Sequence, residues 1–160
     1  MSPNESSALR SQLITAISGR ESQIDFDSAV RDFPSALRGA KPAGAPHTAW
    51  QLLEHMRIAQ NDILEFSRNP DHKSPPWPDG YWPSFDAPPD AKAWDATIKA
   101  FQKDARDLDE LVQNARQDLF KPFAHGDGQT LLRQALLVAT HNSYHLGQFM
   151  FLKKMLTAKT

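Results

Sequence analysis

The sequence lacks several features that define common classes of protein. It contains no cysteine among its 160 residues, which excludes a disulfide framework, a thiol nucleophile and a thiolate metal site. Its formal net charge is only −1 at pH 7, which argues against a nucleic-acid interface or an anionic membrane surface as a partner. No apolar run approaches the roughly 20 residues that span a bilayer, and the N-terminal MSPNESSALRSQ has no secretory signal pattern. We therefore expect a soluble, cytoplasmic protein with a single domain over residues 1–160.

Apolar residues instead recur at helical spacing in several segments, and no segment alternates as a strand does. Thr48 followed by Gln51 forms a capping-box pattern, which predicts that a long helix begins there. The predicted helical regions are short N-terminal helices within 5–38 and main helices over about 48–68, 90–115 and 130–156. The predicted fold class is all-α, a four-helix bundle in which the N-terminal region 5–38 supplies the first helix and the three longer ranges supply the others.

The connection over residues 70–89, PDHKSPPWPDGYWPSFDAPP, holds seven of the twelve prolines. A connection of about twenty residues inside a compact domain is uncommon and is usually either functional or disordered. Its aromatic residues Trp77, Tyr81 and Trp82 argue against disorder. The segment could cover a site as an aromatic lid or plug one end of the bundle, and the sequence leaves both roles open.

Three histidines are candidates for one shared site. His141 and His145 lie four residues apart in ATHNSYHLGQ, which places both rings on one face of the last helix. His55 lies between Leu52 and Ala59 on the inward stripe of helix 48–68. Three imidazoles that meet in a core need hydrogen-bond partners or a shared divalent cation, for which neutral imidazole is a good ligand. A set of three histidines leaves coordination positions open, which is typical of a catalytic site.

Plainer interpretations of the same residues remain open. A histidine pair at this spacing is common by chance, and each ring could be a hydrogen-bonded core residue of a metal-free bundle. His141 is followed by Asn142, so the glutamate of the H-E-x-x-H motif is missing and a metalloprotease is disfavoured. Gln148, one turn past His145, is a candidate to hold a water or substrate, with a helix–helix hydrogen bond as the alternative.

Other polar residues near these positions receive structural interpretations. Surface positions are expected for His47, Glu54, His125 and Asn142, with the mouth of a pocket as the alternative for His47 and His125. Tyr144 is expected to be a packing residue with its hydroxyl at an edge. Asp62 is either an exposed acid or a second contact that orients a ligand imidazole through its other nitrogen.

The segments LLEHMRIAQNDILEF and HNSYHLGQ, separated by a third helix, resemble the DinB-like family of four-helix-bundle proteins over roughly residues 26–156. The resemblance implies an up-down-down-up helix order with a long crossover between the second and third main helices, where segment 70–89 falls. It also implies that His55, His141 and His145 are ligands of a divalent metal ion and that the protein is a homodimer. Some members of the family are transferases or isomerases that use a low-molecular-weight thiol such as bacillithiol or mycothiol.

The function expected from these observations is that of a metal-dependent enzyme, a hydrolase or a thiol transferase acting on a small molecule. The sequence does not choose among zinc, nickel and iron, all of which suit imidazole ligands. The missing glutamate is a weakness of this hypothesis, since a metal-activated water needs a proton acceptor. The alternative is a non-catalytic bundle that binds a metal or a small molecule, for example in a stress response.

Overall fold

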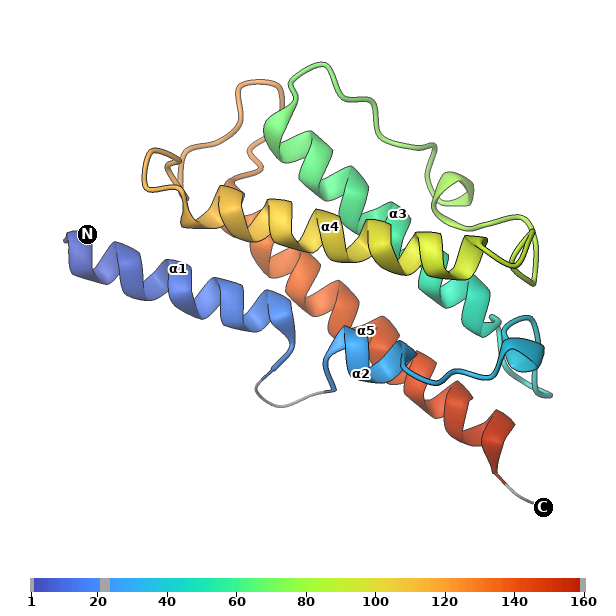
Figure 1. Cartoon of the computed structure of the whole chain (residues 1–160). Helices are drawn as coiled ribbons and strands as arrows, with labels where there is room; N and C mark the ends of the chain where they lie inside the picture. Colours follow the sequence, from blue (N-terminus) through green and yellow to red (C-terminus); the bar gives the residue numbers. More distant parts are fainter. Residues whose placement is uncertain (1, 21–23, 159–160) are drawn as a thin grey trace.

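The computed structural model describes residues 2–20 and 24–158, and within these ranges it contains five α-helices and no strand (Figure 1). The helices are α1 (Pro3–Ser18), α2 (Phe26–Val30), α3 (Ala49–Arg68), α4 (Ala93–Gln113) and α5 (Leu131–Thr157). Two 3-10 turns, η1 (Ser35–Leu37) and η2 (Asp79–Tyr81), lie in the connections. No helix in the described ranges is both long and apolar enough to cross a membrane. The predicted all-α fold is confirmed, while residues 1, 21–23 and 159–160 of the predicted domain lie outside the described residues.

The helices begin where side chains can satisfy the first backbone N–H groups, which have no partner inside the helix. At α3 the Thr48 hydroxyl accepts from the Gln51 N–H (3.1 Å) and the Gln51 side chain accepts from the Thr48 N–H (3.0 Å), so the predicted capping box is present. Ser2 and Glu5 form the same reciprocal pair at the start of α1. This first helix has 16 residues, and it is a full member of the bundle rather than the short element predicted for this region.

Helices α1, α3, α4 and α5 form a four-helix bundle in the predicted up-down-down-up order (Figure 1). Helix α3 packs against α4 and α5, and α1 packs against the same two helices from the other side. Because α3 and α4 run in the same direction, the chain between Arg68 and Ala93 must return along the bundle before α4 begins. This return is the crossover predicted over 70–89.

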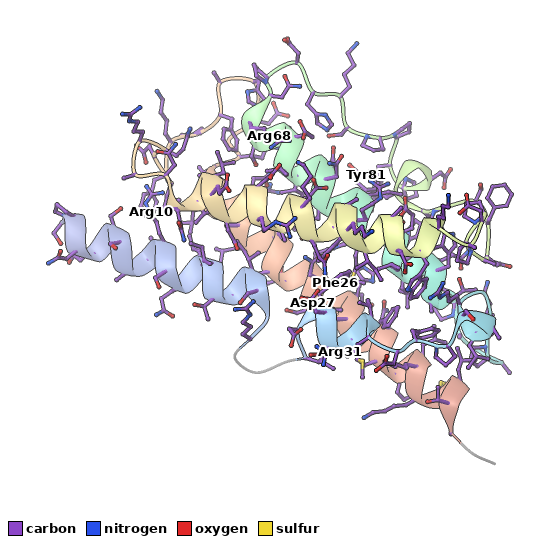
Figure 2. All side chains as sticks on the ribbon, viewed as in Figure 1. Arg10, Phe26, Asp27, Arg31, Arg68 and Tyr81 are labelled. Carbon is purple, nitrogen blue, oxygen red and sulfur yellow. The ribbon has the colours of Figure 1, made fainter. Side chains whose placement is uncertain are left out.

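A buried arginine fixes α1 against the end of α4 (Figure 2). The Arg10 guanidinium donates to the carbonyl oxygens of Val112 (2.5 Å) and Gln117 (2.6 Å). The Val112 carbonyl belongs to the last turn of α4, where carbonyl groups have no intrahelical partner. Arg10 therefore satisfies one acceptor at the end of α4 and one in the loop that follows it.

The core consists of two apolar clusters that follow one another along the bundle. The buried members of the aromatic cluster are Phe26, Ala29, Val30, Phe33, Ala49, Trp50, Leu52, Leu53, Met56, Trp94, Phe101, Leu146, Phe149 and Leu152. The buried members of the aliphatic cluster are Leu13, Ile17, Ile63, Leu64, Leu108, Val112, Leu119, Leu131, Ala135, Val138 and Ala139. On α3, α4 and α5 a buried polar residue lies between the two clusters: Gln60, Asp104 and Asn142, which we call the polar layer.

Candidate metal site

The packing of α3 against α5 brings three histidine rings together beside the polar layer. His55 comes from α3, and His141 and His145 come from α5. The His55 Nε2 atom lies 3.1 Å from the Nε2 atoms of both His141 and His145, and the potential ligand atoms of the three rings all lie within 4.8 Å of one another. His55 and His145 are buried and His141 is half-buried. The three rings that the sequence singled out therefore converge on one point.

Hydrogen bonds at the outer ring nitrogens determine which way the lone pairs point. The His55 Nδ1 lies 2.8 Å from the main-chain oxygen of Tyr81, and a carbonyl can only accept, so this nitrogen carries the proton. The His145 Nδ1 lies 2.8 Å from the Gln148 Oε1 and donates to it in the same way. The Nε2 atoms of His55 and His145 therefore both carry lone pairs, and they face each other at 3.1 Å.

The surroundings keep these rings neutral. Burial, with a smaller contribution from the charge of the neighbouring imidazoles, lowers the pKa of His55 and of His145 to about 4, although the hydrogen bonds to Tyr81 and Gln148 act in the opposite direction. Burial also lowers the pKa of His141. At neutral pH each ring therefore offers an uncharged nitrogen, which is the form that binds metal ions.

This arrangement fits a divalent cation. Two facing lone pairs cannot form a hydrogen bond with each other, whereas a cation between them satisfies both. Nitrogen ligands at 2.0–2.1 Å from a tetrahedral ion lie about 3.3 Å from one another, close to the 3.1 Å separations observed here. In the part of the chain that the structure describes, His55, His141 and His145 are the group that could hold a metal ion.

The crossover lies against this cluster through one aromatic ring. Trp82 stacks on His55, with ring centroids 3.8 Å apart and an interplanar angle of 2°. His47 stacks on Trp82 at 3.8 Å and 12°, and burial lowers its pKa. His47 is thus half-buried, and its expected surface position is wrong. Of the other crossover aromatics, Trp77 is 81% exposed, so it is Trp82 that covers the site.

The crossover also contacts His55 at its outer ring nitrogen, Nδ1. The Tyr81 carbonyl accepts from His55, and the Tyr81 hydroxyl donates to Asp62 Oδ2 (2.7 Å). The other oxygen of Asp62 lies 2.8 Å from His72 Nε2. Asp62 therefore does not contact a ligand imidazole directly, as one interpretation of the sequence proposed. It fixes the tyrosine whose main chain orients His55 (Figure 2 labels Tyr81).

Gln148 makes a contact that neither interpretation of the sequence predicted, while its role in holding a water or substrate stays a prediction. Its Oε1 accepts from His145 within α5, so it makes no helix–helix hydrogen bond there. A partner of this kind fixes the tautomer and the orientation of an imidazole ring. Gln148 and the Tyr81 carbonyl thus perform the same task for two different histidines.

Three other expectations for polar residues are wrong. Asn142 is 4% exposed and donates to the Gln60 side chain (2.9 Å) in the polar layer. Glu54 is half-buried and accepts hydrogen bonds from Thr97 and Arg57, so it is not a free surface charge. Tyr144, expected to pack, is 64% exposed. The errors at Asn142 and Glu54 have one cause: α3 and α5 pack against several neighbours, so their buried arcs are wider than one stripe. Tyr144 lies on the part of α5 that faces solvent.

His125, by contrast, is exposed as expected, and its Nε2 lies 2.8 Å from the Phe66 carbonyl oxygen. The sequence indicates Tyr81 and Trp82 of the crossover only as parts of an aromatic lid or plug, and it does not predict their contacts with His55 and Asp62. Their only signal was the unusual concentration of aromatic residues in a proline-rich loop.

An up-down-down-up bundle with three inward-facing imidazoles from its second and last long helices defines a class of helical proteins with a candidate metal site. The sequence profile of the DinB superfamily matches residues 20–149, a range that includes all three histidines. The chain therefore belongs to the DinB superfamily. Comparisons with curated proteins and with solved structures gave no match.

Proposed function

We propose that the protein is an enzyme that holds a divalent metal ion on His55, His141 and His145 and acts on a small molecule. The observation that carries this proposal is the pair of lone pairs that face each other at 3.1 Å, each fixed by a hydrogen bond behind its ring. Zinc, nickel and iron(II) all suit three imidazole ligands. Membership of the DinB superfamily supports the same choice of residues.

A cation in this position acts as a Lewis acid and lowers the pKa of a coordinated water or thiol. The chain contributes three neutral ligands and leaves further coordination positions for a substrate. Trp82 and the aromatic cluster exclude water from one side of His55. Hydrolysis and thiol transfer are the two reactions that we consider for such a site.

The choice between these reactions depends on where a proton can go. Among the described residues the group that could hold a metal contains no carboxylate, and the nearby Glu54 is engaged by Arg57 and Thr97. A thiol has an ordinary pKa of about 8.5 and ionises far more easily than water. We therefore favour transfer of a low-molecular-weight thiol, which needs no strong base from the protein, over hydrolysis.

The same lack of a carboxylate supports a second candidate, a bundle that binds a metal or a small molecule without catalysis. Turnover separates the two. Purified protein with bound metal is incubated with a panel of small esters and with electrophiles plus a thiol, in the presence and absence of a chelator. Chelator-sensitive turnover supports the enzyme, whereas stoichiometric metal without any turnover across the panel supports the binding module.

The ligand assignment is tested by metal analysis of protein purified without an affinity tag. Wild-type protein should contain close to one divalent metal ion per chain. His145→Ala should lose most of it, because the two remaining histidine ligands bind a metal ion weakly. His125→Ala is the matched control, since this histidine is exposed and lies outside the cluster. Equal metal content in wild type and His145→Ala would contradict the assignment.

The homodimer and the cytoplasmic location stay predictions. Sedimentation of the untagged protein tests the first directly. The low-molecular-weight thiol as a partner likewise stays a prediction, which the turnover panel tests.

A further inference from the structure

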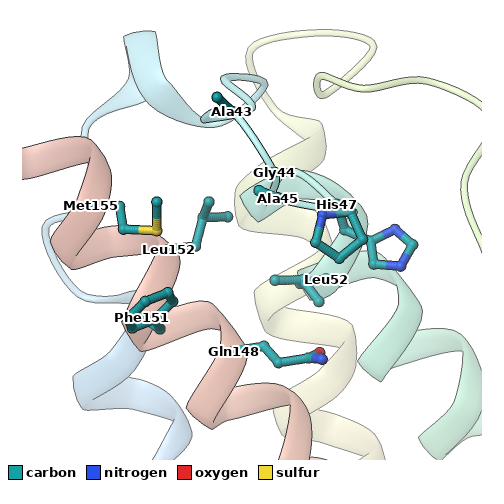
Figure 3. A pocket seen from close by; sticks show the side chains of 10 residues that line it. Ala43, Gly44, Ala45, His47, Leu52, Gln148, Phe151, Leu152 and Met155 are labelled. Carbon is teal, nitrogen blue, oxygen red and sulfur yellow. The ribbon is translucent and has the colours of Figure 1, made fainter.

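A cavity of about 340 Å³ lies beside the three histidines, between the start of α3, the loop before it and the C-terminal half of α5 (Figure 3). Its walls are mainly apolar and include Leu52 of α3, Leu152 and Met155 of α5, and Ala45 of the loop. The volume falls within the range of sites that bind small molecules.

One end of the cavity adjoins the histidine cluster through two residues. Gln148 lines the cavity, and its Oε1 accepts from His145. His47 also lines the cavity and stacks on Trp82, which stacks on His55. Figure 3 shows Gln148 and His47 toward one side and Phe151 with Met155 toward the other. A ligand in this space therefore has a polar end next to the imidazoles and an apolar end along α5.

The described lining of the cavity offers no partner to a charged ligand. Among the residues that the structure describes, no lysine, arginine, aspartate or glutamate contributes to it, and its polar side chains are Gln148 and His47. An ionised group that gives up hydration against these walls gains no partner in return, which is unfavourable. Apolar groups, in contrast, gain free energy in proportion to the area that they remove from water.

We infer that this cavity binds the uncharged, apolar part of the substrate, an aliphatic or aromatic tail, while the reactive polar group lies at the histidine end. The role of the histidine end rests on the proposed function, but binding of the tail depends on the cavity alone. From His145 to Met155 the axis of α5 rises by about 15 Å. A tail can therefore follow the helix from the candidate metal site to the outer end of the cavity.

Isothermal titration calorimetry of metal-free protein with butanamide, hexanamide and octanamide tests this inference. Affinity should rise about fourfold for each added methylene group until the cavity is filled. Hexanoate and hexylammonium, which carry a charge on a tail of similar length, should bind at least tenfold more weakly than hexanamide. Affinities that do not depend on chain length, or equal binding of the charged probes, would overturn the inference.

Two variants locate the binding. Ala43 lines the cavity and is exposed, so Ala43→Trp should fill the space and weaken octanamide binding at least tenfold without disturbing the core. Phe151, 67% exposed at the cavity wall, contributes contact area that Phe151→Ser removes. Leu136→Ser is the matched control, because Leu136 is an exposed apolar residue of the same helix outside the cavity. Octanamide binding that neither cavity variant weakens would place the ligand elsewhere and overturn the inference.

Two further measurements separate the failure of this inference from the failure of the proposed function. Added zinc should tighten binding of octanohydroxamate, whose head group binds metals, and leave octanamide unchanged. If zinc has no effect on either while octanamide still binds with the expected chain-length dependence, the cavity assignment stands and the metal site fails. If octanamide does not bind and Phe151→Ser converts a dimer into a monomer, a second copy of the chain covers this surface and the inference is wrong.

Discussion

The two apolar clusters of the core differ in both chemistry and purpose. The aliphatic cluster joins α1 to α3, α4 and α5 with branched side chains at regular helical spacing. The aromatic cluster instead includes residues of α2 and of the start of α3. Its rings contact one another: the ring centroids of Phe26 and Phe101 lie 3.9 Å apart, and those of Phe33 and Phe149 lie 5.2 Å apart. The candidate metal site lies at the aromatic side of the polar layer, which suggests that one half stabilises the bundle while the other positions the site.

The difference follows from what each half must hold in place. Regular aliphatic packing needs only the helical period, whereas a metal site needs imidazoles fixed to within about 0.5 Å of their working geometry. Trp82 continues the aromatic packing onto His55 itself. Between the halves, Gln60 donates to the Phe101 carbonyl and accepts from Asn142, so the polar layer ties α3 to both α4 and α5 beside the histidines.

The largest effect is expected from removing a core leucine from either half. Leu53 of the aromatic cluster and Leu64 of the aliphatic cluster both lie on α3 and are both fully buried. Leu53→Ala and Leu64→Ala should each lower the free energy of unfolding by about 3–5 kcal/mol, because each leaves a cavity in a packed core. Urea denaturation of the metal-free proteins measures both changes.

Metal binding should separate the two variants. We expect Leu64→Ala to keep the wild-type metal affinity in its folded fraction, and Leu53→Ala to bind metal more weakly because the packing around His55 loosens. Competition with a chromogenic chelator under native conditions gives both affinities. Equal losses of affinity in the two variants would show that the halves do not have separate roles.

A smaller effect is expected from the support behind His55. Burial and the bond to Asp62 raise the pKa of Tyr81 to about 12, so the hydroxyl stays a hydrogen-bond donor at neutral pH. Tyr81→Phe should release the crossover from Asp62 and lower metal affinity about tenfold, the lower end of the range for residues behind a metal ligand. Tyr144→Phe is the matched control, since the other tyrosine of the chain is largely exposed. An affinity of Tyr81→Phe equal to that of the control would show that the bond between the Tyr81 hydroxyl and Asp62 does not support the site.

The helical spacing of residues in the sequence predicted those features that follow from the period of an α-helix alone. Thr48 with Gln51 located the start of α3, and the spacing of His141 and His145 placed both rings on one face, opposite His55. These are local rules, because a helix fixes the direction of each side chain relative to its neighbours. The resemblance to a known family added the order of the helices, which no single stripe contains.

The residues that the sequence misplaced depend on tertiary contacts. Asn142 lies about 100° from the histidine stripe, and it is buried because α5 contacts α1, α2 and α3. Tyr81 and Trp82 lie in an irregular crossover, where no period relates one side chain to the next. Their contacts with Asp62 and His55 exist only because the loop returns along the bundle.

The smallest effect concerns α4 on the aliphatic side of the polar layer. Burial raises the pKa of Asp109 from 3.8 to about 6, against the opposing charge of Arg20, and its buried Oδ1 has no hydrogen-bond partner among the described residues. A raised pKa means that folding favours the protonated acid, so this contribution to stability is complete below pH 3.8 and is lost as the pH rises through 6.

Asp109→Asn keeps this side chain neutral at every pH and should raise the free energy of unfolding by roughly 1 kcal/mol at pH 7, a figure reduced for the partial exposure of the group. The gain should vanish below about pH 4. Asp107→Asn on the same helix is the control of opposite sign, because Lys103 and Arg68 bind that carboxylate and lower its pKa. Urea denaturation of the three proteins at matched pH values measures both effects. A gain for Asp109→Asn that persists at pH 3.5 would show that the buried charge is not its cause.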